Sequence, residues 1–257
     1  MYSINVIELL LLSLIQGVTE FLPISSSSHL ILISNYLNFE NQSLSIDVSL
    51  HIGSFIAVVL YFYKDIINFY ENKTLFLKIL LSSIPVLVIG YFLIKTGEID
   101  KIRNLESIAW TTLIFGILLY ISDKFKLKKN IKKDFTLKSA IFIGTLQILA
   151  LFPGVSRSGI AITAARFLDF KRTDAAKISF LISIPILGAV SAYGFFNIFL
   201  SEDKSFTQIN LLAMLLSFIF SLLTIKFFLQ YISKFNLNIF VIYRVLLGLL
   251  LLKLVYL

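Results

Sequence analysis

Cysteine is absent from the 257-residue sequence, and histidine and acidic residues are scarce. Without cysteine, the chain has no disulfide, no thiolate metal site and no cysteine nucleophile. What is abundant is apolar: 58% of the residues are hydrophobic, and the mean hydropathy is +0.89. A soluble core does not need this much apolar surface, so the sequence predicts a single transmembrane domain over residues 1–257.

The apolar beginning of the chain lacks a basic region and a small-residue cleavage site, so we do not expect a cleavable signal peptide. The formal net charge is +8, but most Lys and Arg lie in short segments between apolar stretches. No basic face interleaved with aromatic residues is present, and we therefore expect no nucleic-acid partner.

Six apolar stretches are long enough to cross a bilayer as helices, which takes roughly 20 residues each. They cover residues 45–63, 75–94, 107–122, 177–197, 209–230 and 238–256. Two further stretches, 4–37 and 138–168, are interrupted at 23–29 and 153–159. The pattern predicts an all-α membrane protein with six transmembrane helices and two re-entrant helix-loop-helix pairs.

Basic residues indicate the orientation of these helices, because cytoplasmic loops carry an excess of Lys and Arg. Segments 64–74, 123–138, 169–177 and 226–235 would share one side, and they hold 14 Lys and Arg. The opposite segments 38–47, 95–107 and 198–208 hold four. With the first set in the cytoplasm, one broken pair enters from outside and the other from the cytoplasm, so that their tips meet near the midplane.

The two breaks also resemble each other at a sequence offset of 130. Pro23, Ser26 and Ser28 recur as Pro153, Ser156 and Ser158. This predicts an inverted-topology repeat with halves at about 1–122 and 136–257, joined by a Lys-rich cytoplasmic loop. Such repeats place a binding site at their interface.

Polar residues of the first break suggest metal and phosphate chemistry. Gln16 and Glu20 lie four residues apart on one helix face, where their oxygens would hold Mg²⁺ or Ca²⁺. Glu20 would equally well pair with Arg157 or His29.

The serine run Ser25, Ser26, Ser27 and Ser28 precedes His29 at a predicted helix start. Free N–H groups at a helix start bind phosphate, and capping alone accounts for one serine rather than four. His29 follows Ser26 by three residues, so we expect it to act as the base for a Ser26 nucleophile.

The second break predicts another anion cradle, formed by Gly154, Ser156, Arg157, Ser158 and Gly159. An arginine guanidinium grips phosphate with two parallel hydrogen bonds. An arginine at membrane depth needs an anionic partner, which Glu20 or a substrate phosphate would supply.

Four other ionisable residues receive structural interpretations. Arg166 and Lys171 are expected to flank a cytoplasmic helix end. Arg244 is expected to extend to the cytoplasmic surface along the last span. His51 is expected to cap the start of the first full span.

The motifs Gln16-Gly-Val-Thr-Glu-Phe-Leu-Pro-Ile-Ser-Ser-Ser-Ser-His29 and Pro153-Gly-Val-Ser-Arg-Ser-Gly159 resemble the two signatures of the undecaprenyl-diphosphatase family, the bacitracin-resistance proteins. The resemblance extends over the whole chain. It includes His-Ile-Gly-Ser at 51–54, Ser-Ile-Pro at 183–185 and Ile-Tyr-Arg at 242–244. Two positions depart from the usual pattern: Ser27-Ser28 replaces Thr-Gly, and Gln16 replaces a glutamate found in some members.

The resemblance implies an enzyme of the bacterial cell membrane that removes the terminal phosphate of undecaprenyl diphosphate. The product carries cell-wall precursors, and its recycling confers bacitracin resistance. By this resemblance Glu20, Ser26, His29 and Arg157 are catalytic, and a divalent cation, Mg²⁺ or Ca²⁺, is the cofactor. It further implies a homodimer.

Alternatives remain at the level of mechanism and function. Ser26 would serve either as nucleophile or as the group that positions a water. A transporter or flippase for an anionic polyprenyl lipid would share the inverted repeat. A phosphohistidine phosphatase is disfavoured, because it needs a second histidine after Ser156-Arg157. We expect the site to open to the outer, periplasmic face.

Overall fold

Helices dominate the computed structural model, which describes residues 5–37, 43–200 and 208–257. Within those ranges no strand forms, and one isolated bridge joins Lys129 to Phe170. Residues 38–42 and 201–207 belong to two of the predicted outer loops and lie outside the described residues.

Six of the described helices are long and apolar enough to cross a membrane, as the sequence predicted. They are α3 (Leu44–Tyr61), α5 (Lys73–Lys95), α7 (Leu105–Asp123), α11 (Arg172–Leu200), α12 (Gln208–Lys234) and α13 (Asn238–Tyr256). α11 begins earlier than expected, at Arg172, because a lysine such as Lys177 is tolerated near the end of a span where its ammonium reaches water. The chain is therefore an all-α multi-pass membrane protein.

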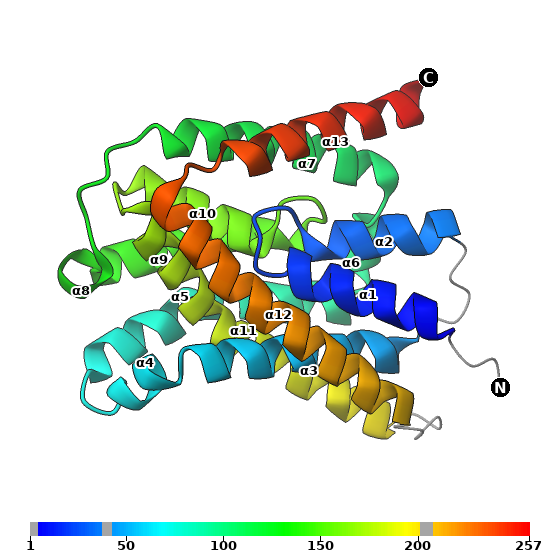
Figure 1. Cartoon of the computed structure of the whole chain (residues 1–257), viewed down its shortest axis with the longest axis horizontal. Helices are drawn as coiled ribbons and strands as arrows, with labels where there is room; N and C mark the ends of the chain where they lie inside the picture. Colours follow the sequence, from blue (N-terminus) through cyan, green and yellow to red (C-terminus); the bar gives the residue numbers. More distant parts are fainter. Residues whose placement is uncertain (1–4, 38–42, 201–207) are drawn as a thin grey trace.

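Both interrupted stretches form helix pairs. The first consists of α1 (Val6–Thr19) and α2 (Ser26–Leu37), and the second of α9 (Leu137–Leu146), the 3₁₀ helix η1 (Gln147–Leu151) and α10 (Arg157–Phe167). α1 and α2 lie side by side, and the loop between them points into the centre of the molecule (Figure 1). That the two pairs are re-entrant within the bilayer stays a prediction. Three short helices complete the described part of the chain: α4 (Tyr63–Asn68), α6 (Glu98–Lys101) and α8 (Ile131–Asp134).

The helix contacts between the two halves of the chain occur in equivalent pairs. α1 packs on α12, and α9 correspondingly packs on α5, while α3 packs on α11 and α7 packs on α13. Small residues allow the closest approaches, as they do between membrane helices generally. A Cβ at Gly53 of α3 would lie 2.9 Å from the backbone nitrogen of Phe218 in α12. The exact division into repeat halves stays a prediction.

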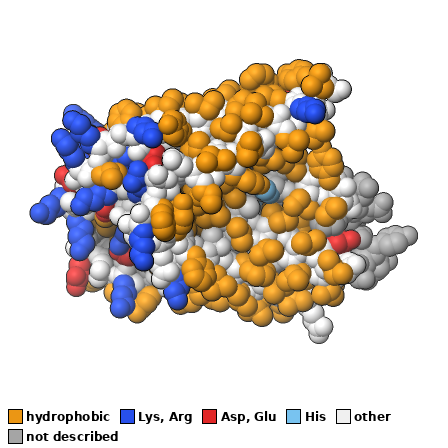
Figure 2. Space-filling view, turned by 45° about the horizontal axis from the view of Figure 1, so that its top comes forward, with side chains coloured by type: hydrophobic (Ala, Val, Ile, Leu, Met, Phe, Trp, Pro, Cys, Tyr) orange, Lys and Arg blue, Asp and Glu red, His pale blue; other side chains and the backbone are white. Residues whose placement is uncertain are grey.

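Charge is distributed unevenly over the surface. Figure 2 shows Lys and Arg side chains gathered at one end of the molecule, while hydrophobic side chains cover most of the remaining face. α4 and α8 lie at the same end in Figure 1. This grouping agrees with the predicted alternation of loops, and we call it the basic end.

Candidate active site

The loops of the two broken helix pairs meet in the interior. Ser158 Oγ donates a hydrogen bond to the Leu22 carbonyl at 2.7 Å, and the Gly154 N–H donates to Ser25 Oγ at 3.2 Å. The structure therefore brings together the two breaks that the sequence placed side by side.

Each helix that follows a break starts at a serine with a left-handed backbone. Ser25, before α2, has φ 76°, and Ser156, before α10, has φ 72°. Such a conformation costs a non-glycine residue about 1–3 kcal/mol and is concentrated at functional sites. The structurally equivalent residues are thus offset by 131 rather than 130, because the second loop has one more residue between its proline and its helix.

Glu20 lies at the centre of the site. Its carboxylate accepts hydrogen bonds from Gln16 Nε2 at 3.1 Å, Ser26 Oγ at 2.7 Å and Arg157 Nη2 at 2.9 Å. The next residue, Phe21, is fully buried and meets Phe180 edge-on, with 5.4 Å between ring centroids. The core thereby fixes the direction in which Glu20 points, and three separate segments converge on one carboxylate.

Arg157 keeps unused hydrogen-bonding capacity. Its side chain is 12% exposed, and its Nε and Nη1 atoms are buried without a partner among the described residues. The backbone N–H groups of Ser26, Ser27 and Ser28 likewise have no partner in the described part of the chain. Buried donors without partners, such as the two Arg157 nitrogens, are costly, and free N–H groups at a helix start attract anions, so this arrangement is complementary to an anion.

His29 does not contact Ser26, contrary to the expectation from their spacing. Its Nδ1 donates to the Ser25 carbonyl at 2.6 Å, and its Nε2 lies 2.6 Å from the Tyr243 hydroxyl. The two rings are stacked, with centroids 5.7 Å apart. Ser26 Oγ donates to Glu20, so the expected contact between Ser26 and His29 does not form here, and the role of His29 as a base stays a prediction. Tyr243 was missed as a site residue, although the Ile-Tyr-Arg segment was its signal.

Most of the predicted phosphate-binding hydroxyls hold the loops together instead. Ser25 Oγ lies 3.1 Å from Ser28 Oγ, and Ser156 Oγ lies 3.1 Å from Ser158 Oγ and accepts from the Gly159 N–H. All four serines are buried. By contrast, Ser26 is half-buried and Ser27 is exposed, so these two remain accessible to a headgroup.

Gln16 connects Glu20 to a histidine on a neighbouring span. Gln16 Nε2 lies 3.0 Å from His51 Nδ1, while Gln16 Oε1 is buried without a partner among the described residues. The prediction that His51 caps α3 is wrong. The cap is Ser43, whose side chain accepts a hydrogen bond from the Ile46 N–H. Gln16 and Glu20 together offer two oxygens to a cation. The described residues contain no group of three or more His, Cys, Asp or Glu that could hold a metal.

Arg244 is fully buried and points into the site, so the prediction that it extends to the surface is wrong. Its guanidinium donates to four carbonyls, those of Pro23 at 3.1 Å, Val155 at 3.0 Å, Gly154 at 2.7 Å and Thr112 at 3.3 Å. Interrupted helices leave carbonyls without intrahelical donors, and nothing in a bilayer replaces them. One side chain from α13 therefore closes both breaks.

A second buried arginine organises the basic end. Arg166 was expected only to flank a helix end. Its side chain is instead fully buried and lies 3.4 Å from Asp123. Its guanidinium also donates to the carbonyls of Asp123, Phe125, Lys126 and Phe170. Asp123 in turn accepts from Arg172 at 2.7 Å, which ties the end of α7 to the start of α11.

Six apolar helices around a buried cluster of carboxylate, hydroxyl and guanidinium define an integral membrane protein with a polar site in its interior. The family described as bacitracin resistance protein BacA matches residues 9–250, nearly the whole chain. The chain belongs to this family.

Three relatives align with this chain over almost the full length of both proteins. A protein of Pelagibacter ubique (strain HTCC1062) is 46% identical over 253 residues, which is 98% of each chain. A protein of Jannaschia sp. (strain CCS1) is 39% identical over 98% of this chain and 99% of its own. One of Saccharophagus degradans is 40% identical over 95% and 96%. All three are named undecaprenyl-diphosphatase.

Proposed function

We propose that the chain is an undecaprenyl-diphosphate phosphatase, which hydrolyses the phosphoanhydride of undecaprenyl diphosphate to undecaprenyl phosphate and inorganic phosphate. The observation that carries this proposal is the cluster around Glu20. A serine hydroxyl is bonded to its carboxylate, and next to it an arginine retains two buried donors that have no partner in the described part of the chain. The identity of the lipid in this proposal comes from the names of the relatives.

In the proposed reaction, the terminal phosphate lies between Arg157 and the N–H groups at the start of α2. Ser26 Oγ attacks the terminal phosphorus while its proton passes to Glu20. The bond from this phosphorus to the bridging oxygen breaks, and undecaprenyl phosphate leaves with that oxygen. Water then cleaves the phosphoserine and releases phosphate. Alternatively, Ser26 and Glu20 orient a water that attacks directly, and both routes use the same residues.

Electrostatic stabilisation is the main contribution of the site, as in phosphoryl transfer generally. Arg157 Nε and Nη1 face the charge that develops on the phosphoryl oxygens. Arg157 Nη2 remains on Glu20, which holds the guanidinium in place. His29 acts indirectly: by donating to the Ser25 carbonyl, it stabilises the left-handed turn at the start of α2.

A divalent cation is part of the proposal, through the family resemblance. Glu20 has a fourth acceptor position beyond its three hydrogen bonds, and Gln16 Oε1 has no partner among the described residues. These two oxygens fit Mg²⁺ or Ca²⁺ when diphosphate oxygens and waters complete the shell, which is the usual situation for Mg²⁺. Such an ion would neutralise charge on the diphosphate.

We further propose that the protein lies in the bacterial cell membrane, with the basic end in the cytoplasm and the site open to the periplasmic face. Recycling of the lipid carrier for cell-wall synthesis then occurs where the carrier is released, and it confers bacitracin resistance. The homodimer implied by the resemblance is tested by light scattering of the purified protein.

The test is phosphate release from undecaprenyl diphosphate by the purified protein in detergent. We expect Glu20→Gln to lower kcat/KM by about 10²–10³-fold, because it removes the acceptor of the Ser26 proton. Glu71→Gln, on the exposed segment before α5, is the matched control and should be fully active.

Two results would contradict the proposal. One is a folded Glu20→Gln variant with the activity of the wild type. The other is movement of the lipid between leaflets of reconstituted vesicles without phosphate release, which would favour the transporter alternative.

A further inference from the structure

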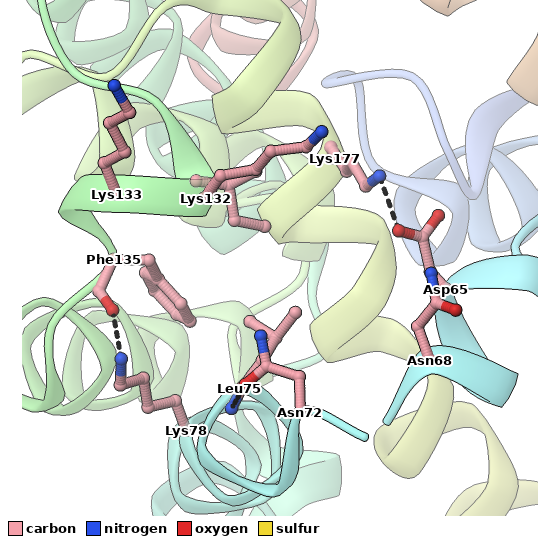
Figure 3. Close-up of a pocket in the computed structure, with 10 residues that line it drawn as sticks. Asp65, Asn68, Asn72, Leu75, Lys78, Lys132, Lys133, Phe135 and Lys177 are labelled. Atoms are coloured by element: carbon pink, nitrogen blue, oxygen red, sulfur yellow. Dashed lines mark hydrogen bonds and ion pairs between the residues drawn. The ribbon is translucent and has the colours of Figure 1, made fainter. Parts of the chain in front are cut away.

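A cavity lined by charged and polar side chains lies at the basic end, among residues that take no part in the two breaks. Its volume is about 320 Å³, room for roughly ten waters. Four lysines line it, together with one carboxylate and two carboxamides: Lys78, Lys132, Lys133, Lys177, Asp65, Asn68 and Asn72 (Figure 3).

The lysines come from three helices. Lys177 of α11 pairs with Asp65 of α4 at 2.6 Å, and Lys78 of α5 donates to the Phe135 carbonyl at 2.6 Å. Figure 3 shows both contacts, and it shows Lys132 and Lys133 leaving α8 in different directions. Neither of these two side chains makes a hydrogen bond or ion pair with the described residues.

The cavity therefore carries more positive charge than its own residues neutralise. Asp65 compensates one ammonium, and three remain. The amides of Asn68 and Asn72 add neutral donors at the rim. Topology signals alone require lysines at this end of the molecule, but they do not require them around one cavity.

The position of the cavity indicates what kind of anion it meets. Lys78 and Lys177 each lie five residues after the first residue of a membrane-spanning helix, at the level expected for lipid headgroups. Exposed apolar side chains flank the same segments, among them Ile67, Tyr70, Phe76 and Leu77. An anionic head with apolar tails matches both features, and basic pockets of this kind recognise phospholipid headgroups.

We propose that this cavity binds the phosphate of an anionic phospholipid from the leaflet at the basic end, with phosphatidylglycerol as the representative ligand. Lys132 and Lys133 contact the phosphate and the headgroup oxygens. Lys78 provides further charge while Lys177 stays paired with Asp65, and the acyl chains lie along the exposed apolar side of α5.

The experiment is titration of the detergent-purified protein with phosphatidylglycerol, followed by native mass spectrometry. The test variant is the double substitution Lys132→Gln/Lys133→Gln. The matched control, Lys128→Gln/Lys138→Gln, removes the same charge from two exposed lysines outside the cavity. We expect about tenfold weaker lipid binding in the test variant and less than a twofold change in the control.

Phosphatidylcholine with the same acyl chains should bind weakly to every variant. Phosphate release from undecaprenyl diphosphate should be unchanged in both double variants, which separates this inference from the proposed function. Melting temperatures should also agree, because the substituted side chains have no partners among the described residues.

Three results would overturn the inference. Equal loss of lipid binding in test and control variants would assign the effect to general surface charge. Equal binding of phosphatidylcholine and phosphatidylglycerol would remove the anion requirement. Inorganic phosphate that displaces the lipid and binds in a Lys132- and Lys133-dependent manner would assign the cavity to free phosphate.

Discussion

Arg157 and Arg244 lie against the same two loops, yet their guanidinium groups are used differently. Arg244 is fully buried and donates to four carbonyls, two of which belong to the adjacent residues Gly154 and Val155. Arg157 donates from Nη2 alone, and its Nε and Nη1 have no partner among the described residues. The satisfied guanidinium holds the two loops together, whereas the incompletely satisfied one has the free donors that the proposed phosphate contact requires.

The largest effect is expected from Arg157→Ala, which tests the second half of this comparison. Loss of the phosphate grip should lower kcat/KM for phosphate release by at least about 10³-fold. The melting temperature should also fall, because Glu20 loses its ion-pair partner, but its bonds from Gln16 and Ser26 remain. Arg103→Ala, an exposed arginine, is the control. An Arg157→Ala enzyme with near-normal kcat/KM would remove the distinction between the two arginines.

Arg244→Met should act in the opposite way, mainly on stability. It leaves four buried carbonyls without donors, which we expect to cost about 3 kcal/mol of unfolding free energy. Thermal unfolding in detergent, followed by the fluorescence of the single tryptophan, measures the loss. Arg244→Lys should recover part of it. Unchanged stability in Arg244→Met together with abolished catalysis would show that Arg244 is a ligand-binding group instead.

The smallest effect is expected from Tyr243→Phe, which tests whether the neighbour of Arg244 in the sequence takes part in the chemical step. The substitution removes a hydrogen bond to His29 Nε2 worth about 1 kcal/mol or less and keeps the stacked ring. We expect kcat/KM to fall by less than about threefold, with an unchanged KM. A loss above about 100-fold would instead place His29 and Tyr243 in the chemical step, and the pH profile of kcat/KM would then change as well.

The sequence predicted the six spans and the two breaks, because both depend on local composition. A run of about 20 apolar residues defines a span, and a proline followed by serines or glycine interrupts one. Glu20, Ser26 and Arg157 were found because polar residues inside apolar stretches are few. These signals require no knowledge of how the helices pack.

What the sequence could not supply was direction and partner. Arg244 and Arg166 were recognised as charges near helix ends. The neighbouring sequence, however, gave no signal that each side chain turns inward to carbonyls on other segments. His29 was assigned to Ser26 by spacing, yet its contacts are the Ser25 carbonyl and a tyrosine 214 residues away. The two left-handed serines are offset by 131, whereas the two prolines are offset by 130, because the second loop has one more residue before its helix.

The bond between Arg244 and the Pro23 carbonyl joins residues separated by 221 positions. At about 5–20 residues per second, a ribosome therefore synthesises the first broken helix pair many seconds before it adds Arg244. During that interval the Pro23 carbonyl lacks this donor. Closure of the two loops by Arg244 is thus a late event of biosynthesis.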